Sequence, residues 1–175
     1  MDGKTRVLFL GTKNSARSQM AEAFLNEYGA EHFEACSAAL SPGEIDPLTR
    51  RVMAELGYDL AGHWAKGVRE YLGKAFFRYL IIPCAKTERD CPKVWPGVSE
   101  RFFWPVEDPT AYAGTEEEKL NKFRKVRDQI RELAKAWVAE KTAAGLPDQA
   151  RVESVPAFRS AGAGAFAFAG GPRGE

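Results

Sequence analysis

The sequence has few cysteines, no long apolar run and almost no net charge, and each of these shortages excludes a class of protein. Its three cysteines are too few for the disulfide framework of a secreted domain, so we expect a cytoplasmic protein. No apolar run approaches the roughly 20 residues that cross a bilayer, and the opening MDGKTRVLF has no signal-peptide core. The net charge of +1 provides no basic field, so neither nucleic acid nor a membrane is an expected partner. With 175 residues, 45% of them hydrophobic, we expect one soluble monomeric domain.

Apolar runs alternate with amphipathic runs along most of the chain. This pattern predicts strands at 6–10 and 75–83, strands that run into loops within 32–40 and 100–109, and helices at 16–28, 47–56 and 115–142. Alternating strands and helices favour an α/β fold, a doubly wound four-stranded parallel sheet flanked by helices. Such sheets bind ligands at the carboxyl ends of their strands. We therefore assign 1–142 to one domain and 143–175, rich in Gly and Ala, to a flexible C-terminal tail.

The segment RVLFLGTKNSARSQMAEAFL (6–25) has the layout of a strand, a polar loop and a helix. Backbone N–H groups of such a loop converge at the helix N-terminus, and Arg17 adds a fork that matches two oxygens of a tetrahedral anion. Asn14 and Ser18 can hold the loop open. The pattern predicts a site for phosphate, arsenate or sulfate, and the alternative is an ordinary connection with an exposed Arg17. The predicted oxyanion cradle consists of Gly11, Thr12, Lys13, Asn14, Ser15, Ala16, Arg17 and Ser18.

Several of these motifs together resemble one enzyme family. NS and RSQMAEAFL in the loop and helix, CAKTERDCP in the middle of the chain and WPVEDPTAYAGTEEEKLNKFRKVRDQIREL near its end carry the resemblance. They are similar to the low-molecular-weight protein tyrosine phosphatases, and above all to their thioredoxin-coupled arsenate reductase branch. The resemblance extends over roughly 7–138 and implies the phosphatase fold.

In that family the first loop residue is the attacking cysteine, whose thiolate the loop amides stabilise. This position is Gly11 here, so the resemblance implies that the usual covalent mechanism is lost and leaves open whether the chain is an enzyme. Arg17 and the loop amides keep what oxyanion binding needs. Asp108 matches the general acid of the family. The alternatives are the neighbouring Glu107 as the acid, and a turn or cap role for Asp108 before Pro109.

Cys84 and Cys91 match the redox pair of the reductases, in which a disulfide forms and thioredoxin reduces it. Lys86, Arg89 or a helix N-terminus would lower the pKa of one thiol. On this interpretation the chain is a thioredoxin-linked arsenate reductase that works through Cys84 and Cys91. The other possibilities are a pair that binds soft As(III) or Zn(II), and two unpaired thiols on a mobile loop. Cys36 is expected in the core.

The leading hypothesis is an arsenate reductase or phosphatase homologue that binds an oxyanion and lacks the covalent step. No cofactor and no resident metal are expected. His32 and His63 have no ligand spacing and are interpreted as structural. Trp104 and Tyr112 are candidates for the rim of the pocket.

Overall fold

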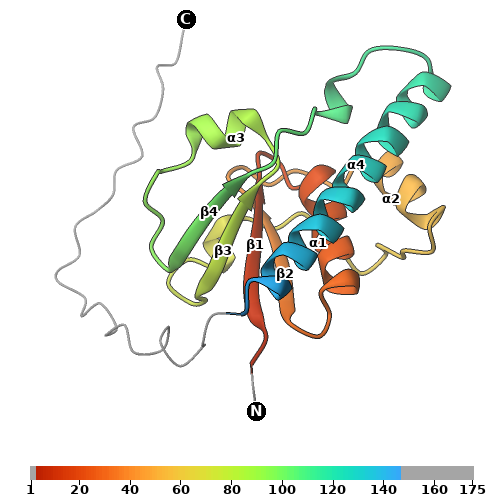
Figure 1. Ribbon diagram of the computed structural model, residues 1–175. Helices are drawn as coiled ribbons and strands as arrows, with labels where there is room; N and C mark the ends of the chain where they lie inside the picture. The colour runs from red at the N-terminus through yellow and green to blue at the C-terminus, as the bar shows by residue number, and fades with distance from the viewer. Residues whose placement is uncertain (1–2, 147–175) are drawn as a thin grey trace, which may run out of the picture.

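Four parallel strands form the centre of the protein, and helical segments cover both faces of the sheet (Figure 1). The computed structural model describes residues 3–146. The strand order is β2-β1-β3-β4, and neighbouring strands are parallel. Their bounds are β1 Thr5–Gly11, β2 Phe33–Ala39, β3 Phe77–Ile82 and β4 Val98–Phe103. The predicted doubly wound, four-stranded parallel α/β fold is confirmed.

Alternate side chains of β1 enter two hydrophobic layers, which explains why the strand is apolar throughout its centre. Val7 and Phe9 belong to the layer that contains Phe24 of the first helix. Leu8 and Leu10 belong to the layer on the opposite face. All four side chains are fully buried, as expected for a central strand that is covered on both sides.

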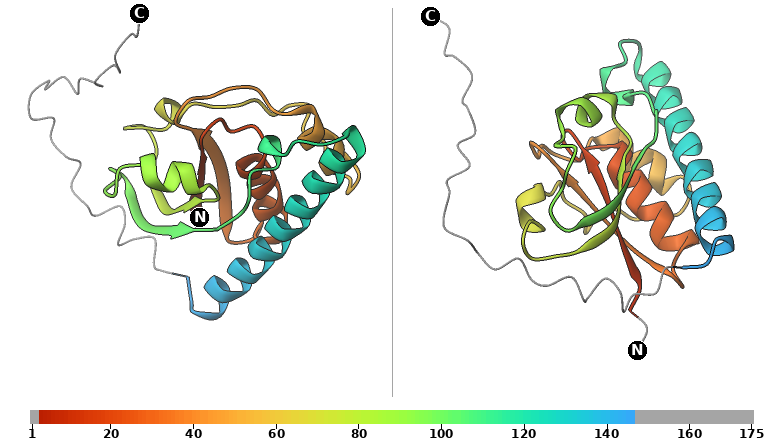
Figure 2. Two further views of the ribbon diagram at one scale, coloured as in Figure 1. Left: turned by 90° about the horizontal axis from the view of Figure 1, so that it is seen from above. Right: turned by 60° about the vertical axis from the view of Figure 1, so that its left-hand side comes forward.

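The first layer is covered by α1 (Arg17–Tyr28), α2 (Pro47–Ala54) and α4 (Glu116–Ala143). These helices lie together on one side of the sheet (Figure 2). A capping box starts α4: the Thr115 hydroxyl accepts from the Glu118 N–H, and the Glu118 carboxylate accepts from the Thr115 N–H. The remaining helical segments are the 3₁₀ turns η1 (Val68–Glu70) and η2 (Pro109–Ala111) and the helix α3 (Ala85–Asp90).

The helix α3 lies where the sequence analysis expected a polar loop. Cys84 and Cys91 are the residues that cap its two ends, and both are buried. Glu88 ties the helix to β4 through an ion pair with Arg101, with Nη2 and Oε2 2.9 Å apart. Both thiols are free, as one of the alternatives expected, but they lie at the ends of a helix that packing and an ion pair support and that is too short to show periodicity.

Two predicted strands have different bounds in the structure. The strand expected within 100–109 covers Val98–Phe103, because Pro105 has no N–H with which to continue the ladder. The strand expected at 75–83 is shorter at both ends and covers Phe77–Ile82. The residues that follow β4 are thereby left as a loop at the carboxyl edge of the sheet.

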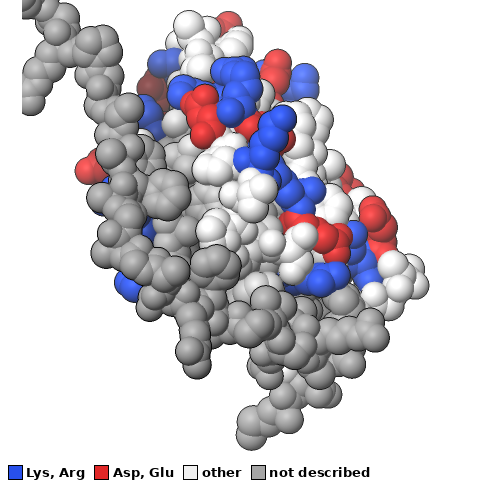
Figure 3. Space-filling model, turned by 90° about the vertical axis from the view of Figure 1, so that its left-hand side faces the viewer, with Lys and Arg blue, Asp and Glu red and all other residues white. Residues whose placement is uncertain are grey.

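The end of α4 at Ala143 lies one residue past the predicted domain boundary. The predicted tail, 143–175, falls outside the described residues from 147 onward, so the division at 142 stays a prediction. Basic and acidic side chains are interspersed on the face turned to the viewer in Figure 3. Within the described residues, no helix has the length and apolar character needed to cross a membrane.

Candidate functional site

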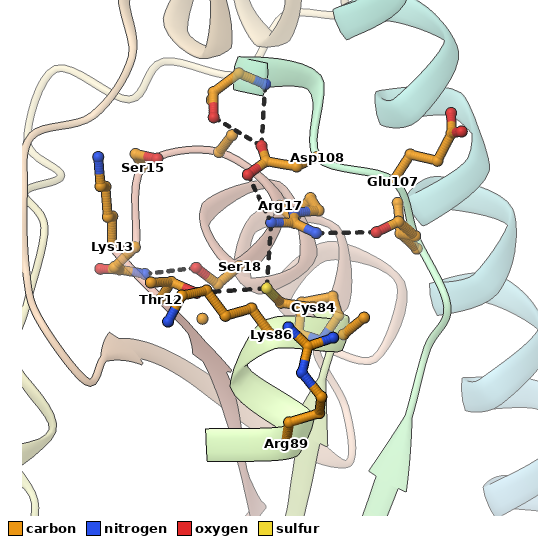
Figure 4. A pocket seen from close by; sticks show the side chains of 17 residues that line it. Thr12, Lys13, Ser15, Arg17, Ser18, Cys84, Lys86, Arg89, Glu107 and Asp108 are labelled. Atoms are coloured by element: carbon orange, nitrogen blue, oxygen red, sulfur yellow. Dashed lines mark hydrogen bonds and ion pairs between the residues drawn. The ribbon is translucent and has the colours of Figure 1, made fainter. Parts of the chain in front are cut away.

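A cavity of about 460 Å³ opens at the carboxyl edge of the sheet, where three segments distant in sequence meet. The loop between β1 and α1, the start of α3 and the loop after β4 each contribute side chains (Figure 4). All eight residues of the predicted cradle line this cavity, together with Cys84 and Asp108. The structure thus brings together every candidate site residue except Cys91.

Asn14 holds the loop in its shape. Its backbone is left-handed, with φ of 57°, a conformation that asparagine tolerates better than most residues. Its side-chain amide donates to Ser18 Oγ at 2.8 Å, and its Oδ1 accepts from Gln19 Nε2 at 2.8 Å and from the Lys66 N–H at 2.9 Å. Asn14 and Ser18 were expected to hold the loop open, and in the structure their side chains bond to each other.

A second network supports the loop from below. The buried Lys66 places Nζ 3.5 Å from Glu22 Oε2, and the Ser37 hydroxyl donates to the same carboxylate. His63 Nδ1 lies 3.2 Å from Gln19 Oε1, as expected of a structural histidine. The sequence analysis missed this network, because its members are scattered along the chain.

Gly11 ends β1 and begins the loop, and it is buried. A Cβ atom at this position would lie 3.2 Å from Ser18 Oγ and 3.7 Å from Ser18 Cβ. A side chain would therefore point toward the base of the cradle, with only Ser18 at close range. Glycine places no functional group there, so any reactive atom in the cavity comes from another residue.

Arg17 starts α1, and its side chain is only 11% exposed. Its Nη1 donates to the Val106 carbonyl at 2.9 Å, and its Nη2 lies 3.2 Å from Asp108 Oδ2 and 3.4 Å from Cys84 Sγ (Figure 4). The alternative of a surface-exposed Arg17 is excluded. The guanidinium instead faces the cavity, where it connects all three segments.

Cys84 contributes the sulfur atom of the site. The residue is 4% exposed, and its Sγ lies 3.4 Å from Thr12 Oγ1, which is 3.0 Å from Thr87 Oγ1. Burial raises the pKa of this thiol. Hydrogen bonds from Thr12 and Thr87 and the charge of Arg17 together outweigh burial and lower the pKa to about 7. The thiolate form of Cys84 is therefore more favourable near neutral pH than that of an ordinary cysteine.

Cys91 has a different environment at the other end of α3. It packs in the second hydrophobic layer and is 5% exposed. Burial raises the pKa of its thiol, an effect that the nearby Arg101 charge offsets only in part. Cys36, the expected core cysteine, is half-buried against the same layer. The three thiols thus differ in kind, and only Cys84 is activated.

Asp108 caps a turn, one of the roles considered for it, and also faces the cavity; its part as a general acid stays a prediction. Its Oδ1 caps η2 by accepting from the Thr110 N–H at 3.0 Å and from the Thr110 hydroxyl at 2.7 Å. Its Oδ2 faces Arg17. Glu107 instead forms an ion pair with Lys122, which lowers the pKa of its carboxyl group. Of the two carboxylates, Asp108 is the one that contacts the Arg17 guanidinium.

Basic side chains surround the mouth of the cavity, and the predicted aromatic rim does not. Lys13, Lys86 and Arg89 line the opening (Figure 4). Trp104 is instead 6% exposed and packs against Phe9, with ring centroids 5.5 Å apart, because its position after β4 points it into the core. The exposed Tyr112, a further rim candidate, does not line the cavity either and lies near Lys122. Among the described residues, no three His, Cys, Asp or Glu side chains form a metal-binding group.

Comparisons with known proteins agree with this architecture. Residues 6–150 match the family model described as low molecular weight phosphotyrosine protein phosphatase. An arsenate reductase of Halalkalibacterium halodurans is 33% identical over 135 residues, which are 77% of this chain and 95% of that protein.

Solved structures extend the comparison to three dimensions. One described as an arsenate reductase in the phosphate binding state has a TM-score of 0.63 at 26% identity, over 78% of this chain and 98% of its own. An arsenate reductase of Archaeoglobus fulgidus has a TM-score of 0.60 at 31% identity, over 76% of this chain and 98% of its own. The chain belongs to the low molecular weight phosphotyrosine protein phosphatase family, and its relatives include bacterial arsenate reductases.

Proposed function

We propose that the cavity binds a tetrahedral oxyanion, phosphate, arsenate or sulfate, without the loop thiolate on which the usual chemistry of the family depends. The observation that carries the proposal is the inward orientation of Arg17, held by Val106 and Asp108 at the N-terminus of α1. A guanidinium matches two oxygens of a tetrahedral anion, and here the anion would take Nη2 over from Asp108 and Cys84. One neighbour in the fold comparison is an arsenate reductase in the phosphate binding state.

The charges around the cavity support binding of a dianion. Unpaired N–H groups at the start of α1 favour negative charge, and Lys13, Lys86 and Arg89 add positive potential at the mouth. Asp108 offsets part of the Arg17 charge, but its side chain is 42% exposed, and an anion would compete only for the contact of its Oδ2 with Arg17, because Oδ1 is bonded to Thr110. With Gly11 at the first loop position, no thiolate lies there to repel the ligand.

Thermal unfolding in the presence of phosphate tests this proposal. At constant ionic strength, phosphate at about 100 times its Kd would add roughly 2.7 kcal/mol to the free energy of unfolding, and so raise Tm by on the order of 5–10 °C. Arg17→Ala should abolish this rise and Arg17→Lys should retain part of it. Arg78→Ala, which removes an ion pair with Glu100 on the distant β3–β4 edge, is the matched control and should keep it. An equal Tm rise in Arg17→Ala would exclude this site.

A second candidate function is arsenate reduction through Cys84 and Cys91, with thioredoxin as the electron donor. It is favoured by one observation, the position of the Cys84 sulfur beside Arg17 inside the cavity. Arsenate-dependent oxidation of NADPH, coupled through thioredoxin and its reductase, tests this function in steady state. A rate that the double substitution Cys84→Ser, Cys91→Ser leaves unchanged would contradict it.

A further inference from the structure

The Cys84 sulfur that faces the cavity follows β3, whereas the cradle loop follows β1. In the sheet register Phe9 of β1 pairs with Ile81 of β3, so Gly11 and Cys84 leave the sheet beside each other at its carboxyl edge. Thr12, the neighbour of Gly11, contacts Cys84 Sγ, and Arg17 contacts the same atom from the far side of the cavity. The Cys84 sulfur therefore contacts Thr12, the residue that follows Gly11, where the loop has no side chain.

An anion held by Arg17 would lie within reach of this sulfur. Nη2 of Arg17 is 3.4 Å from Cys84 Sγ, so an oxyanion bound to the same nitrogen would be a direct neighbour of this sulfur. Attack requires the sulfur and the central atom of the anion to approach to about 3–3.5 Å. The hydroxyl of Thr12 and the charge of Arg17 stabilise the thiolate form of the attacking group.

Building on the oxyanion binding proposed above, we infer that Cys84 takes the part of the missing loop nucleophile and attacks arsenate bound beside Arg17, and that Cys91 resolves the adduct. The attacking atom thus comes from the end of β3, whereas the family resemblance assigns it to the loop. The substrate class is an oxyanion that accepts two electrons, which arsenate does and phosphate does not. Arsenate therefore oxidises the thiols, while phosphate and sulfate only bind.

The reaction balances with two thiols and one arsenate. In the first step the Cys84 thiolate forms an S–As bond, and one As–O bond breaks, with the oxygen leaving as water after protonation. Arsenic stays As(V) in this step. In the second step the Cys91 thiolate attacks Cys84 Sγ: an S–S bond forms, the S–As bond breaks, and its electron pair stays on arsenic. Arsenite, As(III), leaves, and a protein dithiol of the thioredoxin class reduces the Cys84–Cys91 disulfide.

The second step requires α3 to open. Seven residues along a helix separate two Cα atoms by about 10 Å, whereas a disulfide needs less than about 7 Å. Arg101 of β4 ties the helix through Glu88 and the backbone carbonyls of Glu88 and Pro92, and the buried Thr87 ties it to Thr12. These contacts must break in a local unfolding step that brings Cys91 to Cys84.

A single-turnover experiment with the full chain tests the inference. The fully reduced protein is freed of small thiols and mixed with excess arsenate; arsenite is then measured, and the remaining thiols are counted by alkylation and intact mass. We expect about one arsenite per chain and the loss of two of the three thiols. Cys84→Ser and Cys91→Ser should each lose the arsenite product, and Cys36→Ser, the matched control, should retain it. Phosphate in place of arsenate should leave all three thiols free.

The Tm rise caused by arsenate separates failure of this inference from failure of the binding proposal. If arsenate raises Tm but yields no arsenite and leaves the three thiols intact, the cavity binds anions and the inference is wrong. If Tm does not rise either, both proposals are wrong. Arsenite formed equally by Cys84→Ser would also overturn the inference. Unchanged Tm values of the Cys84→Ser and Cys91→Ser proteins without anion establish that the substitutions leave the fold intact.

Discussion

Gly11 is the single residue on which the chemistry of the cradle depends. A Cβ atom added at Gly11 would point to Ser18 and lie 3.2 Å from Ser18 Oγ, which would have to shift by a few tenths of an ångström. The backbone at Gly11 is not left-handed, so an L-residue fits without strain there. The backbone at Gly11 therefore permits a side chain, for which Ser18 Oγ, the acceptor of the Asn14 amide, has to shift slightly.

Gly11→Cys is expected to create a working loop nucleophile. The new thiol would lie next to the N-terminus of α1 and near Arg17, which favour its thiolate. We expect hydrolysis of p-nitrophenyl phosphate where the parent protein has none, and a change in the free energy of unfolding within about 1 kcal/mol. Gly11→Ser, of similar size, is the control and should stay inactive. Continued inactivity of Gly11→Cys, with phosphate binding retained, would mean that Asp108 and Arg17 are not arranged for catalysis.

The Cys84 thiol makes anion binding dependent on pH. Its thiolate and a bound anion share Nη2 of Arg17, and its pKa is about 7 because hydrogen bonds and the Arg17 charge outweigh the effect of burial. Raising the pH through this value adds a negative charge beside the ligand, so anion affinity should fall. If binding raises the Cys84 pKa by about one unit, the Kd rises by about fivefold between pH 6 and 8.

Calorimetry with sulfate measures this effect, because sulfate itself does not titrate over that range. The Kd for sulfate should rise with pH in the parent protein and stay level in Cys84→Ser. A parent protein whose sulfate affinity is the same at both pH values would show that the thiolate does not compete for Arg17.

At the scale of elements, α3 and its tie to β4 control how fast the two thiols meet. Glu88 pairs with Arg101, and its charge also raises the pKa of Cys91. Glu88→Gln should therefore remove the ion pair that ties α3 to β4, and it should also favour the Cys91 thiolate. Both effects act in the direction of faster disulfide formation between Cys84 and Cys91.

Oxidation by diamide, followed by thiol counting, measures this rate. Loss of an ion pair worth roughly 0.5–1 kcal/mol predicts a rate increase of about two- to five-fold in Glu88→Gln. Glu100→Gln removes the Arg78 ion pair on the same edge of the sheet without touching α3, and it should leave the rate unchanged. Equal rates in the two variants would show that the opening of α3 does not depend on Glu88.

The capping box of α4 is a second feature at this scale. The Thr115 hydroxyl accepts the N–H of Glu118 at the start of a helix that covers the first hydrophobic layer. Thr115→Ala should lower the free energy of unfolding by about 1 kcal/mol, measured by urea denaturation. Thr142→Ala, at the opposite end of α4, should cost less. A loss no greater than that of Thr142→Ala would mean that the cap adds nothing to stability.

At the scale of the whole molecule, the region that matches known proteins is shorter than the chain. The match to the Halalkalibacterium halodurans protein covers 95% of that protein with 77% of this chain, and the family model ends at residue 150. A chain that ends at Ala150 should therefore be monomeric by light scattering, with the same Tm as the full chain within about 2 °C and the same Tm rise in phosphate. Aggregation or a lower Tm would show that the remaining residues belong to the domain.

Features that depend on neighbouring residues were predictable from the sequence. The strand, loop and helix of the cradle are continuous in the chain, so the local pattern from Gly11 to Arg17 is sufficient to predict the cradle. The helix α3 escaped prediction because six residues show no periodicity, and its order comes from Arg101 of β4. Trp104 was misassigned to the rim because sequence position does not tell which way a side chain after a strand points.

By itself the sequence determined the parallel α/β fold, the cradle and the presence of Arg17 at the helix start, because apolar periodicity and loop chemistry act over a few residues. Only the tertiary structure decided which thiol enters the cavity. Cys84 lies 72 residues from Thr12 and 67 from Arg17 in the chain, and the pairing of β1 with β3 brings them together. Register between strands is set by packing of the whole core, which no local pattern encodes.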